Sequence, residues 1–174
     1  MIFVVQKHQA TNLHYDFRLE VAGVLKSWAL PKGPSLNPAV KRLAVAVEDH
    51  PLQYASFEGV IQPGQYGAGP VMVWDRGPYT PEDSDDVSES LLSGKLKFML
   101  HGKKLRGSWV LIRTRNANWL LIKHADAYAS KQDITELEPR SILSGRLLSE
   151  IAEQGTDDLV GAHTGTHPRG RRAF

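Results

Sequence analysis

Leu13-His-Tyr-Asp-Phe-Arg-Leu-Glu-Val21 is a segment in which apolar and polar residues alternate one by one. This period of two predicts a β-strand, because successive side chains of a strand point to opposite faces. One face would be apolar, and the other would present four polar side chains: His14, Asp16, Arg18 and Glu20. Outward faces of strands usually carry Lys, Thr, Ser and Glu, so an imidazole, a carboxylate and a guanidinium in succession indicate a functional site.

Similar short segments recur at close spacing through most of the chain. They are rich in Val, Ile, Leu and aromatic residues and are separated by Gly, Pro, Asn and Asp, as expected for strands and turns. The predicted strands cover residues 2–7, 13–21, 24–30, 43–48, 57–61, 71–75, 96–100, 107–115 and 119–124. Helices are predicted at 125–130 and 145–154, with a further short one after the acidic segment 81–90. This spacing predicts a mainly β fold, either a barrel or a sandwich.

The composition favours a single globular domain. The chain has 174 residues, of which 41% are hydrophobic, and this is enough to bury one core. It contains no cysteine, which excludes disulfides, Cys-ligated zinc and cysteine nucleophiles. No apolar run approaches the roughly 20 residues of a transmembrane helix, so we expect no membrane partner. We expect a folded domain over residues 1–154 and a flexible tail or linker over 155–174, where Gly, Thr, His and Arg dominate.

Charge is distributed unevenly along the chain, although the formal net charge is only +2. Between residues 90 and 125 there is no acidic residue and there are eight basic ones: Lys95, Lys97, Lys103, Lys104, Arg106, Arg113, Arg115 and Lys123. Most clusters of this kind are solvated surface, and the alternative is a basic face that follows a nucleic-acid backbone. A phosphate site elsewhere in the chain favours the second interpretation.

Two His residues and one Asp predict a site for a divalent cation. His8 lies at the end of the first predicted strand, so a turn over residues 9–12 can bring it near His14 and Asp16. Two imidazoles and one carboxylate form a facial triad that suits Mn, Fe, Co or Zn.

Three further residues provide groups for an anion. Arg18 has a permanent charge and a planar fork, His50 can donate a proton or a hydrogen bond, and Tyr54 has a hydroxyl donor. A single His is more often a satisfied structural residue, and Tyr54 alone could cap a strand edge. The six residues as a group predict a metal-dependent phosphate site.

Two other functions fit the triad alone. One is a non-catalytic nucleic-acid-binding β-barrel, with basic residues along the nucleic-acid backbone and a structural metal site. The other is a small-molecule oxygenase, since the facial triad also suits Fe(II). Neither accounts for Arg18, His50 and Tyr54 together.

The candidate residues lie within a series of motifs that closely resembles the 3′-phosphoesterase domain of bacterial DNA ligase D. The motifs are Phe3-Val-Val-Gln-Lys-His8, Leu13-His-Tyr-Asp-Phe-Arg-Leu-Glu20, Ser27-Trp-Ala-Leu-Pro-Lys-Gly-Pro-Ser35, Lys41-Arg-Leu-Ala44, Glu48-Asp-His-Pro-Leu52, Phe57-Glu-Gly59 and Gln65-Tyr-Gly-Ala-Gly69. The resemblance continues through Trp119-Leu-Leu-Ile-Lys-His124 to Ser141-Ile-Leu-Ser-Gly-Arg146 and covers most of residues 2–153. Ordered motifs of this length are far more specific than a metal triad.

The resemblance implies a compact single-domain β-barrel with a few short peripheral helices. It implies a Mn²⁺-dependent enzyme, with Co²⁺ or Zn²⁺ as other metals, that hydrolyses 3′-phosphates to 3′-hydroxyls and resects 3′-ribonucleotides. Matching positions assign metal binding to three residues: His8, His14 and Asp16. They assign the phosphate and its transition state to three more: Arg18, His50 and Tyr54. Lys32 and Arg42 match additional phosphate-binding positions, and Glu48 matches a supporting position.

The implied setting is DNA repair by non-homologous end joining. The expected partners are DNA primer–template 3′ ends, ligase and polymerase modules and a Ku-type end-binding protein, in the cytoplasm of a prokaryote near the nucleoid. His50 can serve as an acid or as a covalent nucleophile, and we favour the acid or hydrogen-bonding role. Domains of this family usually carry residues before the Phe3 motif. A chain that starts at Met1 is therefore expected to hydrolyse 3′-phosphates better than it resects 3′-ribonucleotides.

Overall fold

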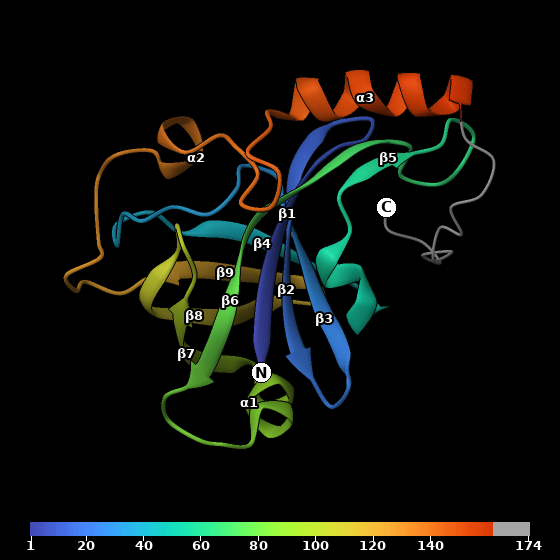
Figure 1. Cartoon of the computed structure of the whole chain (residues 1–174). Coiled ribbons are helices and arrows are strands. Elements are labelled where there is room, and N and C mark those ends of the chain that lie inside the picture. The colour runs from blue at the N-terminus through green and yellow to red at the C-terminus, as the bar shows by residue number, and fades with distance from the viewer. Residues whose placement is uncertain (162–174) are drawn as a thin grey trace.

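Nine antiparallel strands form one sheet in the computed structural model, which describes residues 1–161 (Figure 1). The strands are β1 (Ile2–Gln9), β2 (Leu13–Val21), β3 (Val24–Leu30), β4 (Arg42–Pro51), β5 (Gly59–Ile61), β6 (Gly69–Pro81), β7 (Lys95–His101), β8 (Arg106–Arg115) and β9 (Asn118–Lys123). The helices are the 3₁₀ helix η1 (Leu52–Ser56) and the α-helices α1 (Val87–Ser93), α2 (Ile134–Leu137) and α3 (Leu148–Gly161). The mainly β prediction is confirmed.

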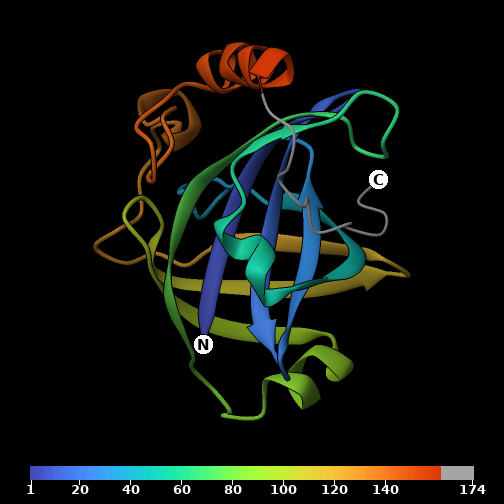
Figure 2. The same ribbon diagram turned by 45° about the vertical axis from the view of Figure 1, so that its right-hand side comes forward.

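The sheet closes on itself to form a barrel. Its strand order is β1-β2-β3-β4-β9-β8-β7-β6, and β1 also pairs with β6, so both edges of β1 are hydrogen-bonded. The short β5 adds to the outer end of β6 (Figure 2). Closure removes the exposed edges that an open sheet would have, and it decides between the predicted barrel and sandwich in favour of the barrel.

Strand β6 is much longer than the predicted 71–75 segment. It first pairs with β1 and then turns onto β7, where Tyr79 lies opposite Leu100. Gly77 allows β6 to lie this close to the end of β7, because any larger residue would place its Cβ only 2.3 Å from the backbone carbonyl oxygen of His101. The three prolines and two glycines of β6 lower its strand propensity, so its length depends on tertiary pairing.

The hairpin of β1 and β2 is buried on both faces. Its inner face contributes Phe3 and Phe17 to the barrel core, together with residues such as Trp74 and Trp109. Its outer face is covered by η1, and a second cluster joins the two: Val4, Leu25, Tyr54, Ala55 and Val73. The alternation of β2 is therefore confirmed, but its polar face lies beneath a helix and its side chains are largely buried.

A buried carboxylate fixes the turn between β7 and β8. Asp75 of β6 is fully buried and accepts hydrogen bonds from three successive backbone N–H groups, those of Lys103 at 2.9 Å, Lys104 at 3.2 Å and Leu105 at 2.7 Å. Without this side chain these N–H groups would lose their acceptor. Asp75 thus joins β6 to a turn about 30 residues away in sequence.

Replacing Asp75 with Ala is expected to lower the free energy of unfolding by about 3–5 kcal/mol, because it leaves three backbone donors unpaired. Urea denaturation followed by circular dichroism measures the change. Asp49→Ala is the matched control, since Asp49 is exposed and only pairs with Lys26 at 3.0 Å, which is worth below about 1 kcal/mol. Equal losses in the two variants would contradict the role given to Asp75.

The predicted helix at residues 125–130 is wrong, and the segment forms turns. The Asp126 carboxylate accepts a hydrogen bond from the Tyr128 backbone N–H and pairs with Lys123, which favours a local turn over a helix. Helix α3 begins three residues later than predicted and continues to Gly161, so the first part of the predicted tail is helical. Residues 162–174 of that tail lie outside the described residues. No helix among those described is long and apolar enough to cross a bilayer.

Candidate metal and phosphate site

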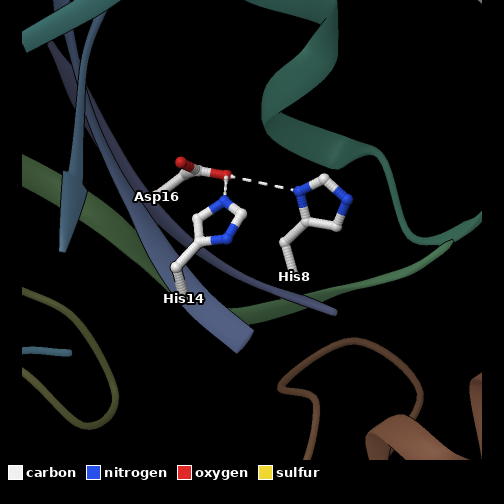
Figure 3. A group of neighbouring side chains, drawn as sticks. All are labelled: His8, His14 and Asp16. Carbon is white, nitrogen blue, oxygen red and sulfur yellow. Dashed lines mark hydrogen bonds and ion pairs between the residues drawn. The ribbon is translucent and has the colours of Figure 1, made fainter. Parts of the chain in front are cut away.

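The register of the first hairpin brings the three predicted metal ligands together. His8 of β1 lies directly opposite His14 of β2, and Asp16 follows two residues later on the same face. The imidazole rings are 4.9 Å apart between centroids, and one ligand atom from each of the three residues lies within 4.8 Å of the others. Figure 3 shows both rings directed toward the carboxylate.

Backbone carbonyls set the tautomers of both His residues. His8 Nε2 lies 2.6 Å from the Gly67 carbonyl oxygen and His14 Nδ1 lies 3.1 Å from that of Asn12, so each nitrogen is the donor. The other ring nitrogens face Asp16 Oδ2, at 3.7 Å from His8 Nδ1 and 3.2 Å from His14 Nε2. In the neutral rings these inner nitrogens carry the lone pairs, which is the arrangement of metal-binding His residues.

Asp16 completes a donor set that fits a cation. Its Oδ1 atom is buried and has no hydrogen-bond partner in the structure, an unfavourable state for a carboxylate oxygen unless a ligand binds it. Burial alone would raise the pKa of Asp16, but the charge of the neighbouring Arg18 opposes this effect, and the pKa lies well below its usual range. The carboxylate is therefore ionised at neutral pH. Two imidazole nitrogens and one anionic oxygen suit a divalent transition metal.

Arg18 lies beside the triad and is held on several sides. Its Nε donates to Gln6 Oε1 at 2.7 Å, its Nη1 donates to Ser27 Oγ at 2.8 Å, and its Nη2 is 3.4 Å from Asp16 Oδ2. The guanidinium also lies 5.0 Å from the centre of the Tyr54 ring. The side chain is only 1% exposed, so its charge acts in a medium of low dielectric and in a fixed orientation.

His50 and Tyr54 approach the same guanidinium from β4 and η1. His50 Nδ1 is 3.1 Å from Arg18 Nη1 and 3.0 Å from the Glu48 carbonyl oxygen, so its tautomer decides which contact is a hydrogen bond. Burial and the charge of Arg18 lower the pKa of His50 to about 4, and the ring is neutral at pH 7. The Tyr54 ring packs against it at 4.8 Å between centroids, and burial raises the pKa of Tyr54.

The structure thus brings together His8, His14, Asp16, Arg18, His50 and Tyr54. The three supporting residues lie elsewhere or contribute differently. Lys32 is exposed in the turn after β3. Arg42 lies on the same face of β4 as Ala44, which is in the core. Its positive charge contributes to lowering the pKa of Asp133. The Glu48 side chain is exposed, and its backbone carbonyl contacts His50. The roles of these three at the site stay predictions.

Two polar residues of the site were not predicted. Gln6 is fully buried, accepts from Arg18, and donates through Nε2 to the carbonyl oxygens of Tyr54 at 2.8 Å and Phe57 at 3.1 Å. Ser27 lies opposite Arg18 in the β2–β3 pair. The spacing of Gln6, two residues before His8, places it on the face of the metal ligands and could have identified it.

Gln6 forms hydrogen bonds with both Arg18 and the backbone of η1. Gln6→Leu is therefore expected to lower the free energy of unfolding by about 2–4 kcal/mol. The substitution keeps the volume but leaves one guanidinium donor and two backbone carbonyls unpaired. Urea denaturation measures the loss. Gln9→Leu is the matched control, because the Gln9 side chain is exposed at the end of the same strand and its replacement should change stability by less than about 0.5 kcal/mol. A neutral Gln6→Leu would contradict this role.

The basic residues between 90 and 125 do not all lie on one face. Lys123 is 1% exposed and pairs with Asp126 at 2.7 Å. The Lys104 ammonium donates to the backbone carbonyls of Glu138 and Arg140, and it lies 4.5 Å from the Trp74 ring. These two side chains make contacts within the protein that stabilise the fold. Nucleic-acid binding by this segment stays a prediction that rests on its exposed cations: Lys95, Lys103, Arg106, Arg113 and Arg115.

The sequence of this chain is similar to those of known proteins. Residues 6–113 match the family described as DNA Ligase D 3′-phosphoesterase domain. The chain is 56% identical over 153 residues to the multifunctional non-homologous end joining protein LigD of Pseudomonas aeruginosa, covering 84% of this chain and 18% of that protein. The corresponding protein of Mycobacterium tuberculosis is 48% identical over 118 residues, covering 68% and 15%, and that of Mycolicibacterium smegmatis is 45% identical over 130 residues, covering 71% and 17%. The chain therefore spans less than a fifth of the length of these relatives.

Proposed function

The chain belongs to the DNA ligase D 3′-phosphoesterase domain family, and we propose that it hydrolyses a 3′-phosphate at a DNA end to leave a 3′-hydroxyl, using a divalent metal such as Mn²⁺. The observation that carries this proposal is the convergence of a three-ligand metal cluster with a buried guanidinium and a neutral imidazole. A phosphate monoester is an anion that a divalent cation and a guanidinium can bind together. The same groups would serve resection of a 3′-ribonucleotide, whose phosphodiester is also anionic.

His8, His14 and Asp16 would hold the metal. Once bound there, a divalent cation supplies Lewis-acid stabilisation of the charge that develops on phosphate oxygens. Three protein ligands leave coordination positions open, as in catalytic sites, whereas structural zinc sites usually have four protein ligands. Within residues 1–161 no fourth His, Asp or Glu joins the cluster. This favours the catalytic reading over a structural metal in a non-catalytic binding barrel.

Arg18 would bind the phosphate and stabilise the transition state. Gln6 and Ser27 hold its Nε and Nη1, so its orientation is fixed before substrate arrives. Its Nη2 lies 3.4 Å from Asp16 Oδ2, so it would face a phosphate oxygen bound beside the three candidate metal ligands. Charge-assisted hydrogen bonds from a preorganised donor in a buried site are a large source of transition-state stabilisation.

His50 would act beside Arg18 on the leaving 3′-oxygen. In the neutral tautomer whose Nδ1 accepts from Arg18, the proton is on Nε2, and this makes Nε2 a hydrogen-bond donor. Its pKa of about 4 makes it a weak carrier of positive charge, so donation of a hydrogen bond is favoured over storage of a proton. Tyr54 packs against both groups and keeps their mutual geometry.

The relatives are multifunctional end-joining proteins, and we infer the same setting for this chain. Ligase and polymerase modules would use the 3′-hydroxyl that it produces, and a Ku-type protein would present the DNA end. The expected substrate is a primer–template junction. The exposed cations between residues 95 and 115 are candidate contacts to its backbone.

The test uses a 5′-labelled primer–template that ends in a 3′-phosphate, incubated with the protein with and without Mn²⁺. Conversion to a 3′-hydroxyl changes the mobility of the primer, and extension by a polymerase confirms the new end. A parallel primer with one 3′-ribonucleotide measures resection. No conversion of either primer by folded protein across Mn²⁺, Co²⁺ and Zn²⁺ would overturn the proposed function.

A further inference from the structure

An exposed aromatic ring lies on the loop beside the metal cluster. Tyr66 is 56% exposed. It belongs to the connection between β5 and β6, which Figures 1 and 2 show next to the β1–β2 turn. Single exposed aromatic residues are common on protein surfaces, so exposure alone indicates nothing. The attachment of this loop to the site is what distinguishes Tyr66.

The loop is fixed to the metal ligands at the next residue. The Gly67 carbonyl oxygen accepts the 2.6 Å hydrogen bond from His8 Nε2. The Cα atom of Tyr66 is one trans peptide from that of Gly67, so it lies at most about 9 Å from the His8 nitrogen. The backbone of Tyr66 is therefore close to the candidate site in the fold, next to a residue that contacts His8 directly.

The backbone of the loop is tight. It has two successive turns. One is closed by a hydrogen bond from Gln65 N to the Gln62 carbonyl and ends just before Tyr66. The other is closed by a bond from Ala68 N to the Gln65 carbonyl and contains Tyr66. At its end Gly69 packs so closely on β1 that a Cβ there would be 1.9 Å from the Gln9 carbonyl oxygen. A ring on a loop held at both positions loses little conformational entropy on binding, which favours a role in recognition.

We propose that Tyr66 stacks on the base of the 3′-terminal nucleotide whose phosphate occupies the site of His8, His14 and Asp16. This inference rests on the proposed function, because that function places a nucleotide there. An aromatic platform suits an enzyme of DNA ends, since every base has a π-face and stacking tolerates any sequence. Tyr66 is then a specificity-determining residue: it distinguishes a nucleoside 3′-phosphate from a phosphate without a base.

The test compares two substrates and three proteins. The substrates are primer–templates with a 3′-phosphate on a normal terminal nucleotide or on an abasic one, and the proteins are native, Tyr66→Ala and Tyr66→Phe. Tyr66→Ala should lower kcat/KM on the normal primer about 10-fold, mainly through KM, whereas Tyr66→Phe should stay within about twofold of native. On the abasic primer native protein and Tyr66→Ala should be equal. Tyr128→Ala is the control, because Tyr128 is also exposed but lies beside Gly107, near the turn after β9.

Fluorescence provides a measurement that does not need turnover. A terminal 2-aminopurine should be quenched on binding to native protein and to Tyr66→Phe, and the quench should be largely lost with Tyr66→Ala. An equal quench with native protein and Tyr66→Ala, or an equal loss of kcat/KM on both substrates, would overturn the role of Tyr66. Absence of phosphate release by native protein overturns the proposed function instead, and the quench comparison still decides the role of Tyr66.

Discussion

Replacing Asp16 with Asn is expected to abolish Mn²⁺ binding and 3′-phosphate release together. Asn keeps the shape of the side chain, but its neutral oxygen is a much weaker ligand, and the site then has two imidazoles and no anion. We expect Mn²⁺ affinity to fall at least about 100-fold and turnover at least about 1,000-fold. Isothermal titration calorimetry measures the first and the labelled-primer assay the second.

Asp49→Asn is the control for this variant. Asp49 neighbours His50 in sequence, but its carboxylate is 44% exposed and pairs with Lys26, away from the metal cluster. It should bind Mn²⁺ and turn over substrate as native protein does. Far-ultraviolet circular dichroism checks that the Asp16→Asn protein is folded. Full turnover by this variant at low Mn²⁺ would reject the assignment of Asp16 as a ligand.

Arg18→Lys is expected to reduce kcat about 100-fold or more while leaving Mn²⁺ affinity within a few-fold of native. Lys keeps the positive charge beside Asp16, so the electrostatic setting of the metal ligands is preserved. It loses the planar fork that contacts Gln6, Ser27 and Asp16 at once, so its ammonium is a point charge without a fixed orientation. Single-turnover kinetics with saturating primer isolates the chemical step.

The matched control for Arg18→Lys is Arg140→Lys, a conservative change at an Arg whose side chain is 58% exposed and pairs with Glu150 at 3.3 Å. It should leave kcat unchanged at saturating DNA. Near-native kcat in Arg18→Lys would show that charge alone suffices at that position, and the role given to the guanidinium fork would be wrong. A parallel loss of metal binding would assign Arg18 to the metal cluster instead of the phosphate.

Most strands were predictable because their signal is local. Alternation over Leu13–Val21 and runs of β-branched and aromatic residues locate strands without any knowledge of tertiary contacts. The full length of β6 was not predictable in this way. Gly77 lets β6 lie close to the His101 backbone, and this contact exists only in the folded barrel. The segment at 125–130 was misread because the Asp126 carboxylate satisfies the backbone of a turn.

In the candidate site too, local sequence signals were predictable and features that depend on tertiary contacts were not. His8, His14 and Asp16 come from one hairpin, so the sequence spacing that predicts the strands also predicts that they meet. Gln6 was missed because a neutral amide carries no chemical signal until its partners, Arg18 and the backbone of η1, are known. The sequence also did not reveal that the eight basic residues lie on different sides. A run of charges does not show that Lys123 lies on the inward side of β9.

The strand that closes the barrel also carries His8, one of the proposed metal ligands. β1 pairs with β2 on one edge and with β6 on the other, and His8 lies at the end of both ladders. Fraying of β1 at this end would move His8 away from His14 and Asp16. With a cation held by these residues as we propose, pairing of β1 and binding of the cation would favour each other thermodynamically. Cation occupancy would then be coupled to the local opening of β1, and the amount of metal in the surroundings would change the rigidity of this part of the barrel.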